Sequence, residues 1–144
     1  MGPRGRHGAR RLLLQALYQR QVGAHDAAEL RSQFMDRDEF ARIDQAYFLA
    51  LLDEILEAVA ALDETIQKAA DRPIAQLDPV EHGVLWIGLA ELQFHPDVPH
   101  KVVIDEAVQL AREFGAQDSY RYINAVLDTL AGGLRGTSRL PGTA

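Results

Sequence analysis

The sequence predicts an all-helical protein, and three observations lead to this prediction. Apolar residues recur at steps of three and four along most of the chain. Sustained period-2 alternation is missing, as are the Asn-Gly and Asp-Gly pairs typical of hairpins. Breaks rich in glycine or proline separate the periodic segments. We expect about six to seven helices in a single domain over residues 1–144, with about three before residue 71 and three after residue 77.

The first predicted helix covers residues 9–22, and Gly23 suits its C-terminal end. A shorter second helix is predicted over residues 27–35. The expected core residues of these two helices are Leu13, Leu17, Leu30 and Phe34.

The longest predicted helix begins near Glu39 or Arg42 and reaches about residue 70. Its apolar residues form a narrow seam that must pack against other helices. Packing within the chain is the interpretation we favour, because helical partners are available there; the alternative is a dimerising coiled coil. The seam consists of Phe48, Leu52, Ile55, Val59, Leu62 and Ile66.

A break at residues 71–83 separates the two halves. Asp78, Pro79 and Glu81 fit the N-cap, first and third positions of a new helix, where the glutamate can close a capping box. This helix is apolar on nearly all sides, so it is predicted to be the most buried. Gly88 would let a neighbouring backbone approach it closely.

The fifth predicted helix has Pro99 near its first turn and ends at Gly115. Asp118 or Ser119 is predicted to cap the sixth, and residues 136–144 form a flexible tail. The expected core residues of these two helices are Val103, Ile104, Ala107, Val108, Ala111, Phe114, Ile123, Val126, Leu127, Leu130 and Leu134.

The composition argues against an enzyme. The chain has no cysteine, which rules out disulfides, thiol nucleophiles and cysteine-bound metals. Its five histidines are scattered, and we find neither a glycine-rich phosphate loop nor a nucleophile elbow. We therefore expect no cofactor and no metal. No apolar run is long enough for a membrane span and the N-terminus is a poor secretion signal, so the expected location is the cytoplasm.

Positive charge gathers at one end of an acidic protein. The formal net charge is −6, from 15 basic and 21 acidic residues. Residues 1–25 hold five arginines and no acid, which leaves 10 basic and 21 acidic residues, a net −11, in the rest. Such asymmetry is typical of a basic arm for a polyanion, although a solubilising tail has the same composition.

The basic segment has the chemistry that single-stranded RNA needs. His7, Arg11 and Tyr18 share one helical stripe beside the Leu13 and Leu17 core stripe. Arginine pairs with phosphate and tyrosine stacks on an unpaired base. Cations at a helix N-terminus oppose its dipole by roughly 0.3–1 kcal/mol each, so stability does not explain them, whereas a bound anion would. The plainer interpretation of Tyr18 is a core-edge tyrosine.

The last helix offers a similar arrangement. Asp118 and Tyr122 lie on one stripe beside the core, and Asp118 or Ser119 could hydrogen-bond to a base edge. A cap followed by a boundary tyrosine explains the same residues equally well.

These same residues carry a resemblance. "QALYQRQ" at 15–21 and "DVPHKVVIDEAVQLAREFGAQDSYRYINAVLD" at 97–128 closely resemble the bacterial transcription antitermination factor NusB family. The resemblance implies two packed three-helix bundles, here about residues 9–70 and 77–135. It also implies a non-enzymatic RNA-binding adaptor that pairs with the ribosomal protein NusE, binds boxA RNA of nascent ribosomal RNA transcripts, and joins other Nus factors and RNA polymerase to suppress termination.

The resemblance also implies functional residues. An arginine-rich motif contacts RNA in the family, and Glu81 and Tyr18 match positions that face the partner. Gly5 and Gly8 interrupt the motif, so we expect residues 1–8 to form a flexible arm before RNA arrives. The residues matching RNA contacts are Arg4, Arg6, Arg10 and Arg11, with His7 at a usually basic position, and Tyr18, Asp118, Ser119 and Tyr122.

Two other functions remain open at this stage. One is a helical interaction module without RNA specificity, which would form a homodimer through the seam or the last helix. The other is a helical hydrolase, for which the sequence shows no acid pair.

Overall fold

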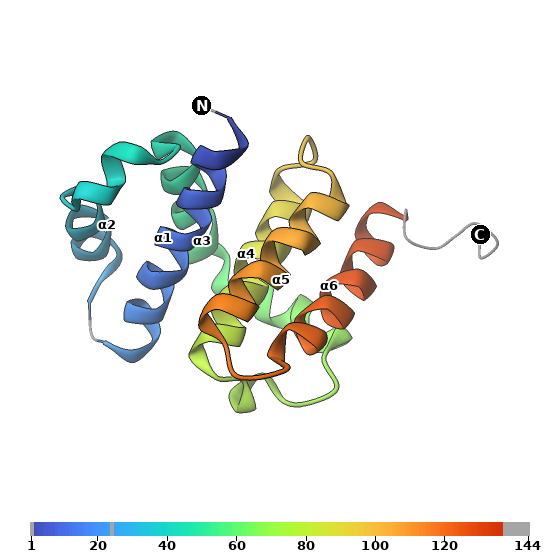
Figure 1. The fold of residues 1–144 in the computed structure, drawn as a ribbon. Helices are drawn as coiled ribbons and strands as arrows, with labels where there is room; N and C mark the ends of the chain where they lie inside the picture. The colour runs from blue at the N-terminus through green and yellow to red at the C-terminus, as the bar shows by residue number, and fades with distance from the viewer. Residues whose placement is uncertain (1, 24, 137–144) are drawn as a thin grey trace. The chain divides into compact units, whose positions relative to one another are not determined.

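The computed structural model describes residues 2–23 and 25–136, and this part of the chain is all helical (Figure 1). This confirms the predicted fold class. No helix in these residues is long and apolar enough to cross a membrane. The elements are α1 (Pro3–Val22), α2 (Ala27–Met35), the 3-10 helix η1 (Asp38–Arg42), α3 (Gln45–Ala69), the 3-10 helix η2 (Ile74–Gln76), α4 (Pro79–Phe94), α5 (His100–Phe114) and α6 (Ser119–Arg135).

The chain divides into two compact units, unit 1 over Met1–Ala58 and unit 2 over Val59–Ala144. The division falls inside α3, where Ala58 leaves the helical region with φ −117° and ψ 15°. The seam of α3 is thus shared between the units, whereas the sequence suggested a border near residue 70.

Unit 1 begins with a longer α1 than predicted. The helix starts at Pro3, a residue whose missing N–H costs nothing at a first helical position. The carbonyl of Gly5 accepts the Asp44 N–H at 3.0 Å, and a Cβ on Gly8 would lie 2.8 Å from Cγ2 of Ile43. Gly8 therefore allows the segment before α3 to pack closely on α1, and the Gly5 carbonyl adds a backbone hydrogen bond to it. The predicted start at residue 9 is wrong for this reason.

An aromatic cluster forms the core of unit 1. Phe48 on α3 is fully buried, stacks on Phe34 of α2 at 6.3 Å between ring centroids, and meets Phe40 of η1 edge-on at 5.6 Å. Phe40 lies in η1, which is separate from α3, so the predicted continuous helix from residue 39 or 42 is wrong there. Residues 27–35 form α2 as predicted, with a capping box between Asp26 and Glu29.

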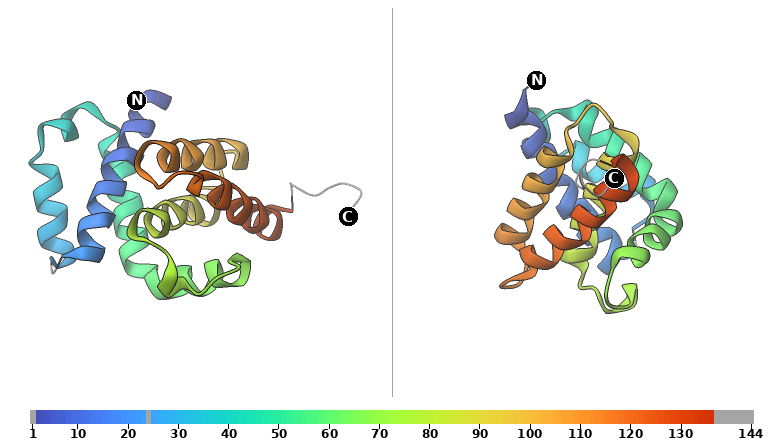
Figure 2. Two further views of the ribbon diagram at one scale, coloured as in Figure 1. Left: turned by 60° about the horizontal axis from the view of Figure 1, so that its bottom comes forward. Right: turned by 90° about the vertical axis from the view of Figure 1, so that its right-hand side faces the viewer.

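Unit 2 packs α5 and α6 around α4, and the three helices lie side by side in the views of Figures 1 and 2. The N-cap Asp78 accepts the Glu81 N–H at 2.8 Å, as predicted, and α4 is the most buried helix. A Cβ on Gly88 would lie 2.7 Å from Cδ1 of Leu127, so a side chain, and not a backbone, approaches there.

Some of the predicted core residues are not in the core. Leu134 is 43% exposed, and Val59, Val108 and Phe114 are only half-buried. Leu110, which we did not predict, is buried instead. Position 110 lies near the edge of the predicted stripe, where periodicity alone does not settle burial.

Arg135, the last residue of α6, donates hydrogen bonds to the backbone at the C-terminal end of α4. Its guanidinium donates to the carbonyls of Val98 at 2.6 Å and of Glu91, Leu92 and His95 at 3.2 Å. The last carbonyls of a helix have no partner within it, and a cation also favours the negative end of the helix dipole. The Arg135 side chain thus supplies hydrogen-bond donors to the carbonyls at the C-terminal end of another helix.

Arg135→Ala is expected to lower the free energy of unfolding by about 2 kcal/mol, because it leaves several part-buried carbonyls without their charged donor. Urea unfolding followed by circular dichroism measures the change. Leu134→Ala is the matched control, since that side chain is exposed and its loss should cost about 0.5 kcal/mol or less. Equal effects of the two substitutions would contradict the capping role.

Candidate nucleic-acid interface

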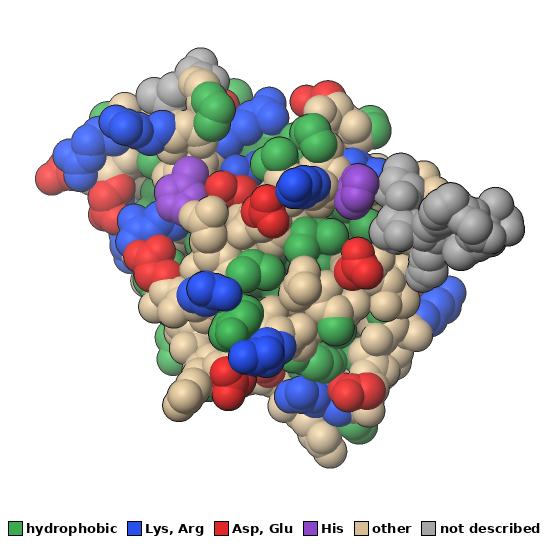
Figure 3. All heavy atoms as spheres, turned by 45° about the vertical axis from the view of Figure 1, so that its right-hand side comes forward, with side chains coloured by type: hydrophobic (Ala, Val, Ile, Leu, Met, Phe, Trp, Pro, Cys, Tyr) green, Lys and Arg blue, Asp and Glu red, His purple; other side chains and the backbone are tan. Residues whose placement is uncertain are grey.

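The predicted site residues divide between the two units, and each group is described within its own unit. On the face shown in Figure 3, Lys and Arg side chains form separate groups among acidic and apolar ones. Local grooves therefore matter more on this face than a broad positive field. Unit 1 holds Arg4, Arg6, His7, Arg10, Arg11 and Tyr18, and unit 2 holds Glu81, Asp118, Ser119 and Tyr122.

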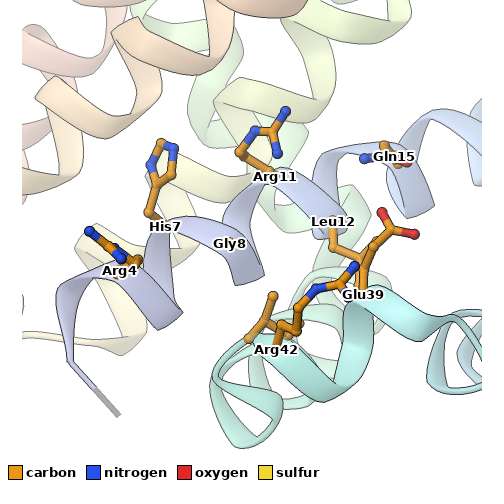
Figure 4. Close-up of a pocket in the computed structure, with 9 residues that line it drawn as sticks. Arg4, His7, Gly8, Arg11, Leu12, Gln15, Glu39 and Arg42 are labelled. Atoms are coloured by element: carbon orange, nitrogen blue, oxygen red, sulfur yellow. The ribbon is translucent and has the colours of Figure 1, made fainter.

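Unit 1 has a basic groove between α1 and η1, with a volume of about 310 Å³ (Figure 4). Helical steps of three and four place its α1 residues on one side, where His7 and Arg11 project together. The groove thus unites part of the predicted motif with a segment far away in sequence. Its lining residues are Arg4, His7, Gly8, Arg11, Leu12, Gln15, Glu39, Arg42 and Ile43.

The basic groove has an excess of positive charge. Three arginines and one histidine line it, against the single carboxylate of Glu39. Within the described residues, Arg4 and Arg42 form no hydrogen bond or ion pair that would neutralise them. Arginines held in a concave surface without acidic partners favour an anion, and their planar forks suit phosphate.

Sequence reasoning missed Arg42. Its position follows from the approach of residues 43 and 44 to α1, which Gly8 permits. The only signal in the sequence was an arginine outside the N-terminal segment, and no spacing relates it to Arg4 or Arg11.

Arg6 and Arg10 face another side of α1 and contact Tyr47 of α3. Their guanidinium carbons lie 4.3 Å and 5.5 Å from the ring centroid of Tyr47, and Arg6 also pairs with Asp44 at 3.9 Å. Arg10 is only 3% exposed. These two arginines fasten α1 to the start of α3, and in this conformation Arg10 is not presented to a ligand at the surface.

Tyr18 is exposed, with 44% of its surface accessible. It lies two turns beyond Arg11 on α1, about 10 Å further along at 1.5 Å per residue. An exposed aromatic ring at this distance from the basic groove has the geometry for stacking on an unpaired base.

In unit 2, Asp118 does not cap α6 with its side chain. Its backbone is left-handed, with φ 67° and ψ 0°, and no side-chain cap forms. Its carboxylate instead pairs with Arg121 at 3.6 Å, and both side chains are exposed. The predicted cap is wrong because the capping geometry needs an extended backbone. Aspartate is among the few residues that tolerate the left-handed region.

Tyr122 belongs to a cluster with Arg72 and Glu81. The guanidinium carbon of Arg72 lies 3.9 Å from the ring centroid of Tyr122, and its Nη1 lies 3.8 Å from Glu81 Oε1. Burial raises the pKa of Tyr122, and the charge of Arg72 opposes this shift. The Tyr122 hydroxyl and the Ser119 Oγ are buried without a hydrogen-bond partner. The cluster brings one predicted RNA residue and one predicted partner residue into contact with the same arginine.

Glu81 gives this cluster a pH dependence. Burial, and then the charge of Asp78, raise the pKa of Glu81 above 4.5, while a hydrogen bond from the Asp78 backbone and the charge of Arg72 lower it less. The folded state therefore holds this proton more tightly than the unfolded state. This contribution stabilises the fold at low pH and is lost as the pH rises from about 4.5 through the raised pKa.

Glu81→Gln is expected to gain stability relative to the wild type as the pH rises, because glutamine has no buried charge to form. Urea unfolding of both proteins at about pH 4 and about pH 7 measures the difference. A stability difference that favours the wild type more at the higher pH would contradict this sign.

The described residues contain no group of three or more histidines, aspartates and glutamates able to hold a metal ion. The arginines, tyrosines and polar side chains described above suit recognition by charge, stacking and hydrogen bonding.

Comparison with known proteins decides the family. The model of the NusB family matches residues 7–132 of this chain. The chain belongs to the NusB family. The transcription antitermination protein NusB of Alcanivorax borkumensis is 44% identical over 133 residues, which cover 92% of this chain and 89% of that protein. The protein of the same name from Shewanella amazonensis is 40% identical and covers 90% and 97% of the two chains.

Solved NusB structures share the fold. A structure of T. maritima NusB superposes with a TM-score of 0.78 at 25% identity, covering 95% of this chain and 96% of that one. A crystal structure of the antitermination factors NusB and NusE in complex with double-stranded RNA gives 0.80 at 24% identity, covering 92% and 99%. The NusB relatives confirm the predicted family and its role as a transcription antitermination protein rather than an enzyme.

Proposed function

We propose that this NusB family member binds single-stranded boxA-type RNA together with NusE, as one NusB-like domain. It then acts in the cytoplasm as an adaptor to other Nus factors and RNA polymerase. The observation that supports this most is the basic groove, in which Arg4 and Arg42 have no acidic partner among the described residues. A polyanion supplies the missing counter-charge.

In unit 1, the proposed roles follow from exposure and charge. Arg4, Arg11 and Arg42 pair with phosphates, with His7 beside them, and Tyr18 stacks on a base. Arg6 and Arg10 hold α1 in place for this contact. In unit 2, the roles follow from the family resemblance: Asp118, Ser119 and Tyr122 contact the RNA, and Glu81, with Tyr18, contacts NusE. Ser119 and Glu81 are buried in this conformation, so their contact requires a local change.

Homodimerisation through the seam is less well supported. The seam residues Phe48, Leu52, Ile55 and Ile66 are fully buried, and Leu62 is 1% exposed. A dimer would have to use another surface. Light scattering with and without RNA shows whether a dimer forms and whether RNA dissociates it into monomers.

Fluorescence anisotropy with a labelled boxA-type RNA tests the proposal. We expect much tighter binding when NusE and this protein are both present than with either alone. A scrambled RNA of the same length is the control for specificity. Equal affinity for the two RNAs, or an affinity that NusE does not change, would refute the proposal.

A further inference from the structure

A second groove lies in unit 2, between α5 and α6, which run side by side (Figures 1 and 2). Its volume is about 440 Å³, within the range of roughly 300–1,000 Å³ that is usual for small-ligand pockets. None of its residues was singled out as a functional residue in the sequence. It is lined by Asp105, Val108 and Arg112 from α5 and by Tyr120, Arg121 and Asn124 from α6.

Tyr120 contacts two positively charged side chains of this groove. The guanidinium carbons of Arg112 and Arg121 lie 4.2 Å and 5.3 Å from its ring centroid. Contact with the ring holds the guanidinium groups in place and leaves N–H donors at their edges. The ring therefore positions two arginines that repel each other in the absence of an anion.

Little negative charge neutralises this pair within the described residues. Arg112 makes no ion pair or hydrogen bond there. Arg121 meets only Asp118, at 3.6 Å, with 72% and 64% of the two side chains exposed. Such an exposed pair is weak and gives way to a stronger acceptor. Two guanidinium groups on one ring, of which only Arg121 has a carboxylate partner and a weak one, match a phosphate.

The groove also holds two polar side chains that are not basic. Asn124 offers an amide with donors and an acceptor, and Asp105 offers a carboxylate acceptor. An acidic peptide would bring a second carboxylate against Asp105. A nucleotide instead places its phosphate at the arginines and the amino and carbonyl edges of its base at the asparagine and aspartate.

We propose that the groove between α5 and α6 binds one nucleotide of the single-stranded RNA. Arg112 and Arg121 hold its phosphate, and Asn124 and Asp105 meet its base. This rests on the proposed function and adds to it a site formed by α5 and by the first turns of α6, which follow Asp118. Tyr120 is a positioning residue, because it acts through the two arginines.

The test compares Arg112→Gln and Arg121→Gln with Lys101→Gln in the full-length protein with NusE and boxA-type RNA. Lys101 is exposed on the same helix and outside the groove, so its substitution removes an equal charge. Affinity is measured by anisotropy over a series of salt concentrations. Each arginine variant should bind about fivefold more weakly and lower the slope of log affinity against log salt by about 0.7, the value for one phosphate contact on a single strand. Lys101→Gln should change neither.

Two further variants test the role of the ring. Tyr120→Leu should weaken RNA binding, and Tyr120→Phe, which keeps the ring, should restore it. Circular dichroism confirms that all the variants are folded.

Three results would overturn the inference. The first is that Arg112→Gln and Arg121→Gln bind RNA as Lys101→Gln does, which refutes the groove while leaving the proposed function intact. The second is that the variants lose affinity for NusE alone, which assigns the groove to a protein partner. The third is that the wild type with NusE binds no RNA, in which case the proposed function and this site both fail.

Discussion

Replacing Arg4, Arg11 and Arg42 together by glutamine is expected to weaken binding to boxA-type RNA by about 10- to 100-fold at moderate salt. Each arginine of the basic groove that contacts a phosphate releases about 0.7 counterion from a single strand. Three lost contacts should therefore lower the log–log salt slope by about 2. Anisotropy titrations over a range of salt concentrations measure both quantities.

A second triple variant provides the control for charge alone. Arg31, Lys68 and Lys101 lie on α2, α3 and α5, outside the basic groove, and their replacement by glutamine removes the same charge. This control should keep most of the affinity and nearly all of the salt slope. If the two triple variants lose affinity equally, net charge rather than the groove drives binding.

Phe48→Ala is expected to cause the largest loss of stability, about 3–5 kcal/mol. Phe48 is fully buried and contacts both Phe34 and Phe40, so its truncation leaves a cavity between α2, η1 and α3. Native domains are stable by only about 5–15 kcal/mol, so this loss removes a large part of the margin.

Urea unfolding followed by circular dichroism measures this loss, and Trp86 fluorescence follows unit 2 separately. Phe94→Ala is the matched control, because Phe94 is 43% exposed and its removal should cost about 0.5 kcal/mol or less. A loss below about 1 kcal/mol for Phe48→Ala would contradict the packing described for unit 1.

Capping residues and apolar periodicity predicted helix ends correctly where no distant segment packs against the helix end. The apolar pattern and Gly23 defined the end of α1. Asp78 and Pro79 defined the start of α4, since proline and a capping side chain act within one turn.

The errors in the fold arose where distant segments meet. Gly8 packs against Ile43 and the Gly5 carbonyl accepts the Asp44 N–H, and no local pattern in the sequence predicts these contacts. Asp118 adopts a left-handed backbone, and Arg135 caps a helix 40 residues or more away in the sequence. The contacts of Ile43 and Arg135 depend on tertiary partners that periodicity cannot identify.

Only part of the candidate site could be predicted, because the rest of it depends on contacts between segments that are distant in the sequence. Helical spacing grouped His7 with Arg11, and both line the basic groove. Spacing alone favoured a core-edge position for Tyr18, which is 44% exposed. It could not show that Arg10 would be buried against Tyr47, because that ring comes from another helix. The groove between α5 and α6 was missed because its residues share no motif.

An NMR titration of the ¹⁵N-labelled protein, with unlabelled NusE and boxA-type RNA, tests the central claim most directly. The account predicts that RNA shifts the amide signals of residues 4–18 and 118–124 most strongly and leaves those of α2 (Ala27–Met35) nearly unchanged. Shifts concentrated on α2, or none at the basic groove while RNA is bound, would contradict it.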